Sequence, residues 1–222
     1  MEDKSKKNIK TILRLFPYLN DKKKAEKLKI DDDSIYYISI REHADKISKI
    51  IHNELLKLHL DPKQCVITDA TAGVGGNTIS FAKNFREVNS IEIEEKRFNY
   101  LVNNVNLYEL DNVNFYNEDC TKILPCIDNH DVVYVDPPWG GKSYKNHEFL
   151  KLQISQVSIE MMCNHILDYK IMKKVPVMIV LKLPNNYDIH YLYKTIKSKT
   201  IYFYNLEKMY ILVIINDNFK KV

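Results

Sequence analysis

The five glycines of this 222-residue chain fall in two short segments whose residue types suit contact with a ligand. The first segment reads DATAGVGGNT over residues 69–78, and the second reads DPPWGG over residues 136–141. Glycine tolerates positive φ angles and lets the backbone approach a ligand closely. The first segment contains GxGG in place of the GxGxxG of dinucleotide-binding loops, which disfavours NAD. Both segments are therefore candidate ligand-binding loops, with a ligand other than NAD at the first.

The second segment could orient an amine for reaction. Pro137 and Pro138 have no amide hydrogen, so the carbonyl groups of Asp136 and Pro137 can accept hydrogen bonds from a substrate. An exocyclic amine on a purine is a poor nucleophile, and hydrogen bonds to a carboxylate and a carbonyl would aim its lone pair at a methyl donor. Such positioning contributes several of the roughly 7–11 kcal/mol that proximity can offer. Trp139, the sole tryptophan, could stack on a base, or on a cationic 7-methylguanine, for about 1–3 kcal/mol.

Three acidic residues mark the ends of the first three expected strands. Asp69 stands before the glycines, where a carboxylate can meet a positively charged group such as an α-ammonium. Glu92 lies about as far downstream as the acidic side chains that accept hydrogen bonds from ribose hydroxyls. Asp119 follows the third strand and is placed to receive an adenine amino group. Together the three carboxylates predict a ligand that combines a nucleoside with an amino acid.

Strands and helices alternate along the chain in an order that would gather these loops at one edge of a sheet. Apolar spacing predicts a helix over 42–60, followed by strands over 65–68, 88–93, 113–116, 131–135, 175–181, 201–204 and 209–215. Intervening helices begin at 77, end at 107, and cover about 148–170 and 187–196. The pattern predicts an α/β fold, with a mostly parallel sheet covered by helices on both faces. A short turn at 205–207 makes the last two strands an antiparallel pair.

The first 35 residues are expected to form a basic appendage to a single domain over 36–222. Their amphipathic segment (Ile9, Ile12, Leu13 and Phe16) is closed by Pro17. Ten basic residues lie from position 4 to position 29. This arm is a candidate for contact with phosphates, and a solubilising tail is the alternative.

The composition argues against several classes of protein. The four cysteines form no CxxC pair and have no histidine at metal-ligand spacing, so neither a disulfide framework nor a metal site is indicated. No apolar run approaches the ~20 residues of a membrane span. We expect a soluble intracellular protein of the nucleus or cytoplasm, a monomer by default, whose net charge of +4 fits a nucleic-acid partner without requiring one. The abundance of Lys, Asn, Ile and Tyr is typical of an AT-rich genome, such as that of a protist or of a large DNA virus acting in a host cell.

With these motifs the chain resembles the trimethylguanosine synthase family of RNA cap guanine-N2 methyltransferases. Residues 69–79 are similar to the family's cofactor loop and residues 137–141 to its catalytic loop, within a resemblance that covers about residues 36–215. It implies the Rossmann-like, seven-stranded class I methyltransferase fold, S-adenosyl-L-methionine as donor, and N2 of 7-methylguanosine in an RNA cap as acceptor. The residues implied for the cofactor are Asp69, Thr71, Gly73, Gly75, Asn77, Thr78, Glu92, Asp119 and Asp136. Those implied for catalysis are Asp136, Pro137 and Trp139, and those for the substrate are Trp139, Lys182, Asn186 and Tyr144.

Two departures from the family's pattern leave the acceptor open. The family's catalytic loop generally begins with Ser, whereas Asp136 gives DPPW, a form similar to that of amino-methyltransferases acting on adenine or unmodified guanine. Lys182 stands where the family has a second aromatic residue that sandwiches the cap base. A lysine could bind the cap phosphates instead, and Tyr144, Tyr187 and Tyr36 are candidate replacements for the aromatic ring. The alternatives are transfer to unmethylated guanine N2 or adenine N6 of RNA or DNA, and a non-catalytic RNA-binding subunit.

Two other segments agree with the family's pattern. Asn186 and Asp188 follow the proline of that motif as the family's residues do. Tyr36, Tyr37 and Ser39 lie where the family has an aromatic-Ser segment that closes over the donor. The N-terminal segment itself is shorter than the helical extension with which the family's enzymes complete the cofactor and cap sites.

Overall fold

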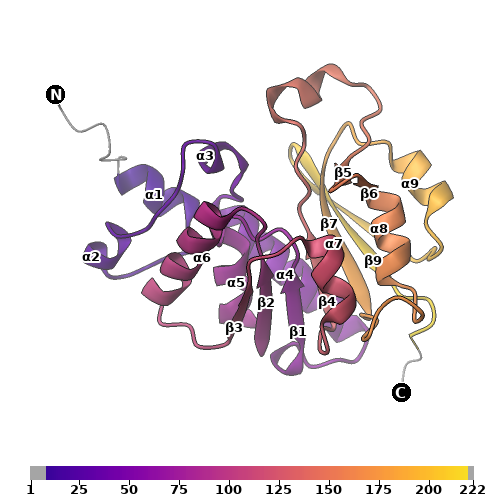
Figure 1. Cartoon of the computed structure of the whole chain (residues 1–222), viewed down its shortest axis with the longest axis horizontal. Coiled ribbons are helices and arrows are strands. Elements are labelled where there is room, and N and C mark those ends of the chain that lie inside the picture. The colour runs from indigo at the N-terminus through magenta and orange to yellow at the C-terminus, as the bar shows by residue number, and fades with distance from the viewer. Residues whose placement is uncertain (1–8, 220–222) are drawn as a thin grey trace.

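The computed structural model describes residues 9–219 as an α/β fold built on one large sheet (Figure 1). Seven strands lie in the order β3-β2-β1-β4-β7-β9-β8. The first five strands of this order, β3 through β7, run parallel to one another, and β9 is antiparallel to both β7 and β8. The strands are β1 (Val66–Asp69), β2 (Glu87–Ile91), β3 (Val113–Tyr116), β4 (Val132–Val135), β7 (Met178–Pro184), β8 (Ile201–Leu206) and β9 (Met209–Ile215). The predicted fold class, a mostly parallel sheet ending in an antiparallel pair, is confirmed.

The sheet separates two apolar cores, because successive side chains of a strand point to opposite faces. In β4, Val132 and Tyr134 join one core, whereas Val133 and Val135 join the other. The first core is covered by α4 (Arg41–Lys57) and α5 (Gly76–Asn84), and the second by α7 (Cys120–Ile123), α8 (Ile159–Ile166) and α9 (Ile189–Thr195). Among the described residues, no helix is long and apolar enough to cross a membrane.

The long helix predicted over 148–170 is wrong. Only Ile159–Ile166 is helical in that stretch, and it follows an antiparallel hairpin of β5 (Gln153–Ile154) and β6 (Val157–Ser158). Buried Leu150, Leu152 and Ile154 alternate with exposed residues, which is the period of extended chain and not of a helix. The two residues of the hairpin turn, 155 and 156, take positive φ angles that no helix could include.

The described part of the N-terminal segment packs on the edge of the fold beyond β3. It contains α1 (Ile9–Leu15), α2 (Lys22–Ala25) and α3 (Ser34–Tyr37). Ile12, Leu15 and Phe16 are buried in a third apolar cluster that also holds Leu101 and Val105 of α6 (Glu95–Leu107). The first lysines of the basic arm, at positions 4, 6 and 7, lie outside the described residues. The division of the chain at residue 35 stays a prediction.

Candidate active site

The glycine loop (residues 69–78) joins β1 to α5 at the carboxyl edge of the sheet. Gly73 and Gly75 have φ angles of 55° and 99°, in the left-handed region that side chains disfavour. A Cβ atom on Gly75 would lie 3.0 Å from Leu101 Cδ1, and one on Gly76 would lie 2.8 Å from Ile38 Cγ1, so both glycines allow close packing. A Cβ atom on Gly73 would meet no atom within 4 Å, so this part of the loop faces open space.

Asp69 carries a buried carboxylate that is half satisfied. Thr78 Oγ1 donates to its Oδ2 at 2.7 Å, while the buried Oδ1 has no hydrogen-bond partner among the described residues. Burial raises the pKa of this carboxyl group to about 7. Buried polar atoms are normally paired, so the unpaired oxygen indicates a place for a donor or a cation from a ligand.

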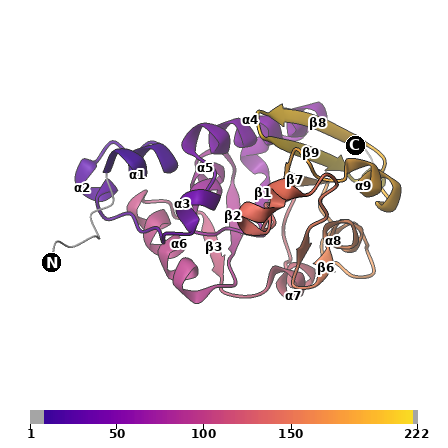
Figure 2. The same cartoon turned by 90° about the horizontal axis from the view of Figure 1, so that it is seen from above.

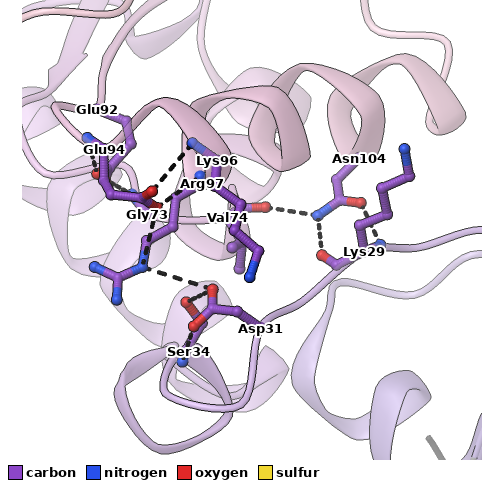
Figure 3. A network of polar contacts seen from close by, with 10 residues as sticks. All are labelled: Lys29, Asp31, Ser34, Gly73, Val74, Glu92, Glu94, Lys96, Arg97 and Asn104. Carbon is purple, nitrogen blue, oxygen red and sulfur yellow. Dashed lines mark hydrogen bonds and ion pairs between the residues drawn. The ribbon is translucent and has the colours of Figure 1, made fainter. Parts of the chain in front are cut away.

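Glu92 is held against the glycine loop (Figure 3). Its Oε2 accepts a hydrogen bond from the amide of Gly73 at 2.8 Å, and its Oε1 accepts one from the amide of Glu94 at 2.9 Å. Burial raises the pKa of Glu92 above its usual value. Because the carboxylate lies directly beside the most open glycine, a ligand at that glycine would contact it.

Asp119 lies at the end of the neighbouring strand β3 and caps α7. Its Oδ1 accepts hydrogen bonds from the amide and the hydroxyl of Thr121, at 2.9 and 2.8 Å. Burial acts to raise the pKa of Asp119, but hydrogen bonds from Ser155 and Thr121 outweigh it and the pKa is lowered. The three predicted acids therefore end three adjacent strands, β1, β2 and β3.

Two further residues of the glycine loop connect it to other segments. Thr71 Oγ1 accepts a hydrogen bond from the amide of Asp136 at 2.8 Å, which joins the two predicted loops. Asn77 donates through Nδ2 to Ser39 Oγ and to Tyr134 Oη, both at 3.1 Å, and its buried Oδ1 has no partner among the described residues. Ser39 thus lies beside the loop.

Asn104 is a site-supporting residue that sequence reasoning missed. Its side chain exchanges two hydrogen bonds with the backbone of Lys29, at 2.7 and 2.8 Å, and also donates to the carbonyl of Val74 at 2.8 Å (Figure 3). It therefore ties the N-terminal segment to the glycine loop. The available signal was an amide between Leu101 and Val105 on the buried side of a helix.

The proline loop (residues 136–141) begins with an ion pair between two strands. The register pairs Val135 of β4 with Leu181 of β7, so the next residues, Asp136 and Lys182, are also neighbours. Lys182 Nζ lies 2.6 Å from Asp136 Oδ2, and the two side chains are only 5% and 16% exposed. Burial raises the pKa of Asp136 even though Lys182 acts to lower it. The structure thus places the lysine that was predicted to bind phosphates on the predicted catalytic carboxylate.

Trp139 lies next to this ion pair. Lys182 Nζ is 5.5 Å from the centre of the indole ring, and Tyr144 meets the ring edge to face, with centroids 5.2 Å apart. The indole Nε1 is buried and makes no hydrogen bond of ordinary geometry among the described residues, but its N–H faces the Asp136 carboxylate closely enough to act on it. Gly140 and Gly141, with φ angles of 86° and 68°, lead from the indole into the turn of 3-10 helix Gly141–Asn146, which carries Tyr144.

The remaining predicted residues have different surroundings. Asn186 donates to the carbonyls of Tyr144 and His147, at 2.8 and 2.7 Å, and so holds the segment after the proline loop. Tyr187 is buried and donates to Glu160, as a packing residue does. Tyr36 is 77% exposed. Of the three tyrosines considered as replacements for the aromatic ring, Tyr144 is therefore the one in contact with Trp139.

Comparison with known proteins identifies the family. The model of the RNA cap guanine-N2 methyltransferase family matches residues 64–221, which include both loops. The chain belongs to this family. The chain is 40% identical to Uncharacterized protein L320 of Acanthamoeba polyphaga mimivirus, over 93% of this chain and 86% of that protein. It is also 36% identical to trimethylguanosine synthase of Schizosaccharomyces pombe, over 36% of this chain and 35% of that protein.

Solved structures show the same fold at low sequence identity. A precorrin-6y C5,15-methyltransferase from Geobacter metallireducens matches with a TM-score of 0.55 and 16% identity, over 83% of this chain and 95% of that one. The protein SMU.1697c from Streptococcus mutans, solved in complex with SAH, matches with a TM-score of 0.50 and 12% identity, over 75% of this chain and 96% of that one. The predicted family resemblance and the methyltransferase fold are both confirmed.

Proposed function

We propose that this methyltransferase-family chain transfers a methyl group from S-adenosyl-L-methionine to the exocyclic N2 of 7-methylguanosine in an RNA cap. The observation that carries the proposal is the juxtaposition of two carboxylate sites at one sheet edge. The buried Asp69 keeps one unpaired oxygen, and Asp136 begins a proline loop with a partly buried tryptophan. Family membership and the similarity to a fission-yeast trimethylguanosine synthase support the choice of acceptor.

The residues around the glycine loop fit the donor. The unpaired Oδ1 of Asp69 suits the α-ammonium group, because a buried carboxylate is stabilised by a cation. Glu92 would accept hydrogen bonds from the ribose hydroxyls, Asp119 would receive the adenine amine, and the open face of Gly73 leaves room for the ligand. The bound donor supplies an electrophilic methyl group on its sulfonium. The complex of the S. mutans protein of this fold with SAH supports this donor.

The proline loop would orient the acceptor amine. One N–H of the amine would donate to the Asp136 carboxylate and the other to the carbonyl of Pro137, which aims the nitrogen lone pair at the methyl group. Lys182 holds Oδ2 of Asp136, so we expect the amine to bond to Oδ1. Trp139 would stack on the base, and Tyr144 supports the indole from its edge. After transfer, the nitrogen loses a proton, for which the carboxylate is the nearest acceptor in this arrangement.

The ion pair favours a second candidate, transfer to N2 of unmethylated guanine in RNA. Lys182 neutralises Asp136 and already lies within cation–π distance of the indole ring. A cationic 7-methylguanine would bring a second positive charge to this position, whereas a neutral guanine would not. The choice between a cationic and a neutral base therefore depends on Lys182.

Radiolabelled methyl transfer tests both candidates. Purified protein is given labelled donor with 7-methyl-GTP, GTP or uncapped RNA, and the products are digested to locate the methyl group. Label on N2 of 7-methyl-GTP, lost in Trp139→Ala and largely kept in Trp139→Phe, supports cap methylation. Label on GTP or uncapped RNA with none on 7-methyl-GTP supports the neutral base. Donor binding without transfer to any nucleic acid would contradict both and favour the non-catalytic subunit.

A further inference from the structure

A basic groove runs between α4 and the edge strand β8, outside the site described above. It has a volume of about 270 Å³ and is lined by residues of both elements. Figure 2 shows α4 lying beside β8 at one margin of the molecule. The lining residues are Lys46, Lys49, Ile50 and Asn53 of α4, and Tyr204, Asn205 and Leu206 of β8.

The charged residues that line the groove are both lysines, which suits a polyanion. Lys46 and Lys49 are exposed on adjacent turns of α4, and no ion pair engages either of them within residues 9–219. A third lysine, Lys57, extends the same side of the helix, and it pairs with the buried carboxylate of Glu54. The exposed acids nearby are Glu42, Asp45 and Glu207, and Asp45 accepts a hydrogen bond from the hydroxyl of residue 80.

Of the two exposed aromatic rings of β8, one lies on the side of these lysines. Tyr202 and Phe203 of β8 are 44% and 50% exposed. Neighbouring residues of a strand face opposite ways, so Tyr202 shares the α4 side with Tyr204, whose hydroxyl bonds to Glu54. Lys57 Nζ lies 5.5 Å from the centre of the Tyr202 ring. Lysines beside an exposed ring suit single-stranded nucleic acid, because phosphates can contact the charges while a base stacks on the ring.

The groove opens next to the candidate active site. The turn between β8 and β9 is bonded to the end of β7 through Asn185, whose amide donates to the carbonyl of Lys208 at 3.4 Å. His43, in the first turn of α4, interacts electrostatically with both Glu207 of that turn and Lys182 of the ion pair. The turn that follows the lining residues of β8 therefore lies at the carboxyl end of β7, the strand that carries Lys182.

We propose that the α4–β8 groove binds the single-stranded RNA that adjoins the methylated nucleotide. Two backbone phosphates contact Lys46 and Lys49, and a base stacks on Tyr202. This inference rests on the proposed function, because it requires the acceptor base to be part of an RNA chain. It goes beyond that function by naming a second surface, which a mononucleotide acceptor does not reach.

The test compares a mononucleotide acceptor with an RNA acceptor in the same assay. The variant Lys46→Glu/Lys49→Glu should raise KM for a short capped RNA about tenfold or more, and leave KM and kcat for 7-methyl-GTP unchanged. The dependence of log affinity on log salt for a single-stranded RNA should become shallower by about 1.4, because each lost phosphate contact removes about 0.7. Tyr202→Ala should weaken RNA binding several-fold without changing the salt dependence.

Lys170→Glu is the control, since it reverses an exposed lysine in the connection from α8 to β7, and α8 covers the face of the sheet opposite to α4. Thermal unfolding of each variant checks that the fold is kept. Unchanged RNA affinity and salt dependence in the double variant would overturn the proposal that the groove binds RNA. An equal loss of activity with 7-methyl-GTP would overturn it too. Retained RNA binding together with loss of a protein partner would also overturn it.

Direct binding separates this inference from the proposed function. If wild-type protein methylates no nucleotide, the proposed function fails. Fluorescence anisotropy with a labelled single-stranded RNA still tests whether the groove binds RNA. Tight wild-type binding that the double variant weakens supports the groove whichever base is methylated, and binding that Lys170→Glu weakens equally contradicts it.

Discussion

The glycine loop and the proline loop follow strands of the same sheet, but the carboxylate of one lacks a charged partner and the carboxylate of the other has one. Asp69 is buried with one oxygen unpaired among the described residues, and its pKa is raised to about 7. Asp136 is mostly buried but bonded to Lys182 at 2.6 Å. The first carboxylate therefore needs a cation from a ligand, whereas the second already has one from the chain. The difference fits a cationic donor at one loop and a neutral amine at the other.

The largest expected effect comes from breaking the ion pair. Asp136→Ala leaves the ammonium of Lys182 buried without its partner, and such a change lowers the free energy of unfolding by about 3–5 kcal/mol. Urea denaturation measures this loss, and methyl transfer should disappear. The control is Asp136→Ala/Lys182→Met, which removes both charges and should recover much of the stability but none of the transfer. Full stability in the single variant would show that Lys182 does not depend on Asp136.

Asp69→Asn should have the opposite effect, with the stability kept and donor binding weakened. The substitution keeps the shape and the bond from Thr78 but removes the charge. Loss of one charge-assisted hydrogen bond costs about 1.5–3 kcal/mol, so the donor dissociation constant should rise about 10- to 100-fold. Isothermal titration calorimetry measures it. A stability loss as large as that of Asp136→Ala would erase the contrast between the loops.

The sequence predicted the acids around the glycine loop but not the ion pair of the proline loop. The glycines, Asp69, Glu92 and Asp119 could be predicted as one group, because each lies next to its own strand and parallel strands gather their ends. The partner of Asp136 could not, because Lys182 is brought to it by the pairing of β4 with β7, across a long segment of chain. The predicted helix over 148–170 was wrong for a related reason. The pairing of β5 with β6 depends on tertiary burial, which the apolar pattern of the sequence alone does not reveal.

Asp69 also predicts how the site responds to pH. Its folded-state pKa of about 7 lies above the unfolded value of about 4, so the free energy of unfolding should fall as pH rises from about 4 to 7. Donor binding requires the ionised carboxylate and should instead strengthen as the pH rises through 7, by about tenfold from pH 6 to pH 8. Calorimetry from pH 6 to pH 8 measures this trend in donor affinity, and Asp69→Asn should remove it. A pH trend that survives in Asp69→Asn would assign the titration to another group.

The smallest effects should come from glycine substitutions that strain the backbone. They allow the two loops to be compared without a change of charge. Gly73 and Gly140 both have positive φ angles, 55° and 86°, and a Cβ atom on either would meet no atom within 4 Å. Alanine at each position is therefore penalised by conformation and not by contact, at about 1–2 kcal/mol of stability. If the loops serve different ligands, Gly73→Ala should raise the donor dissociation constant a few-fold and leave acceptor KM unchanged. Gly140→Ala should do the reverse. Equal effects of both variants on both ligands would mean that the loops form one site, because Thr71 already joins them through the amide of Asp136.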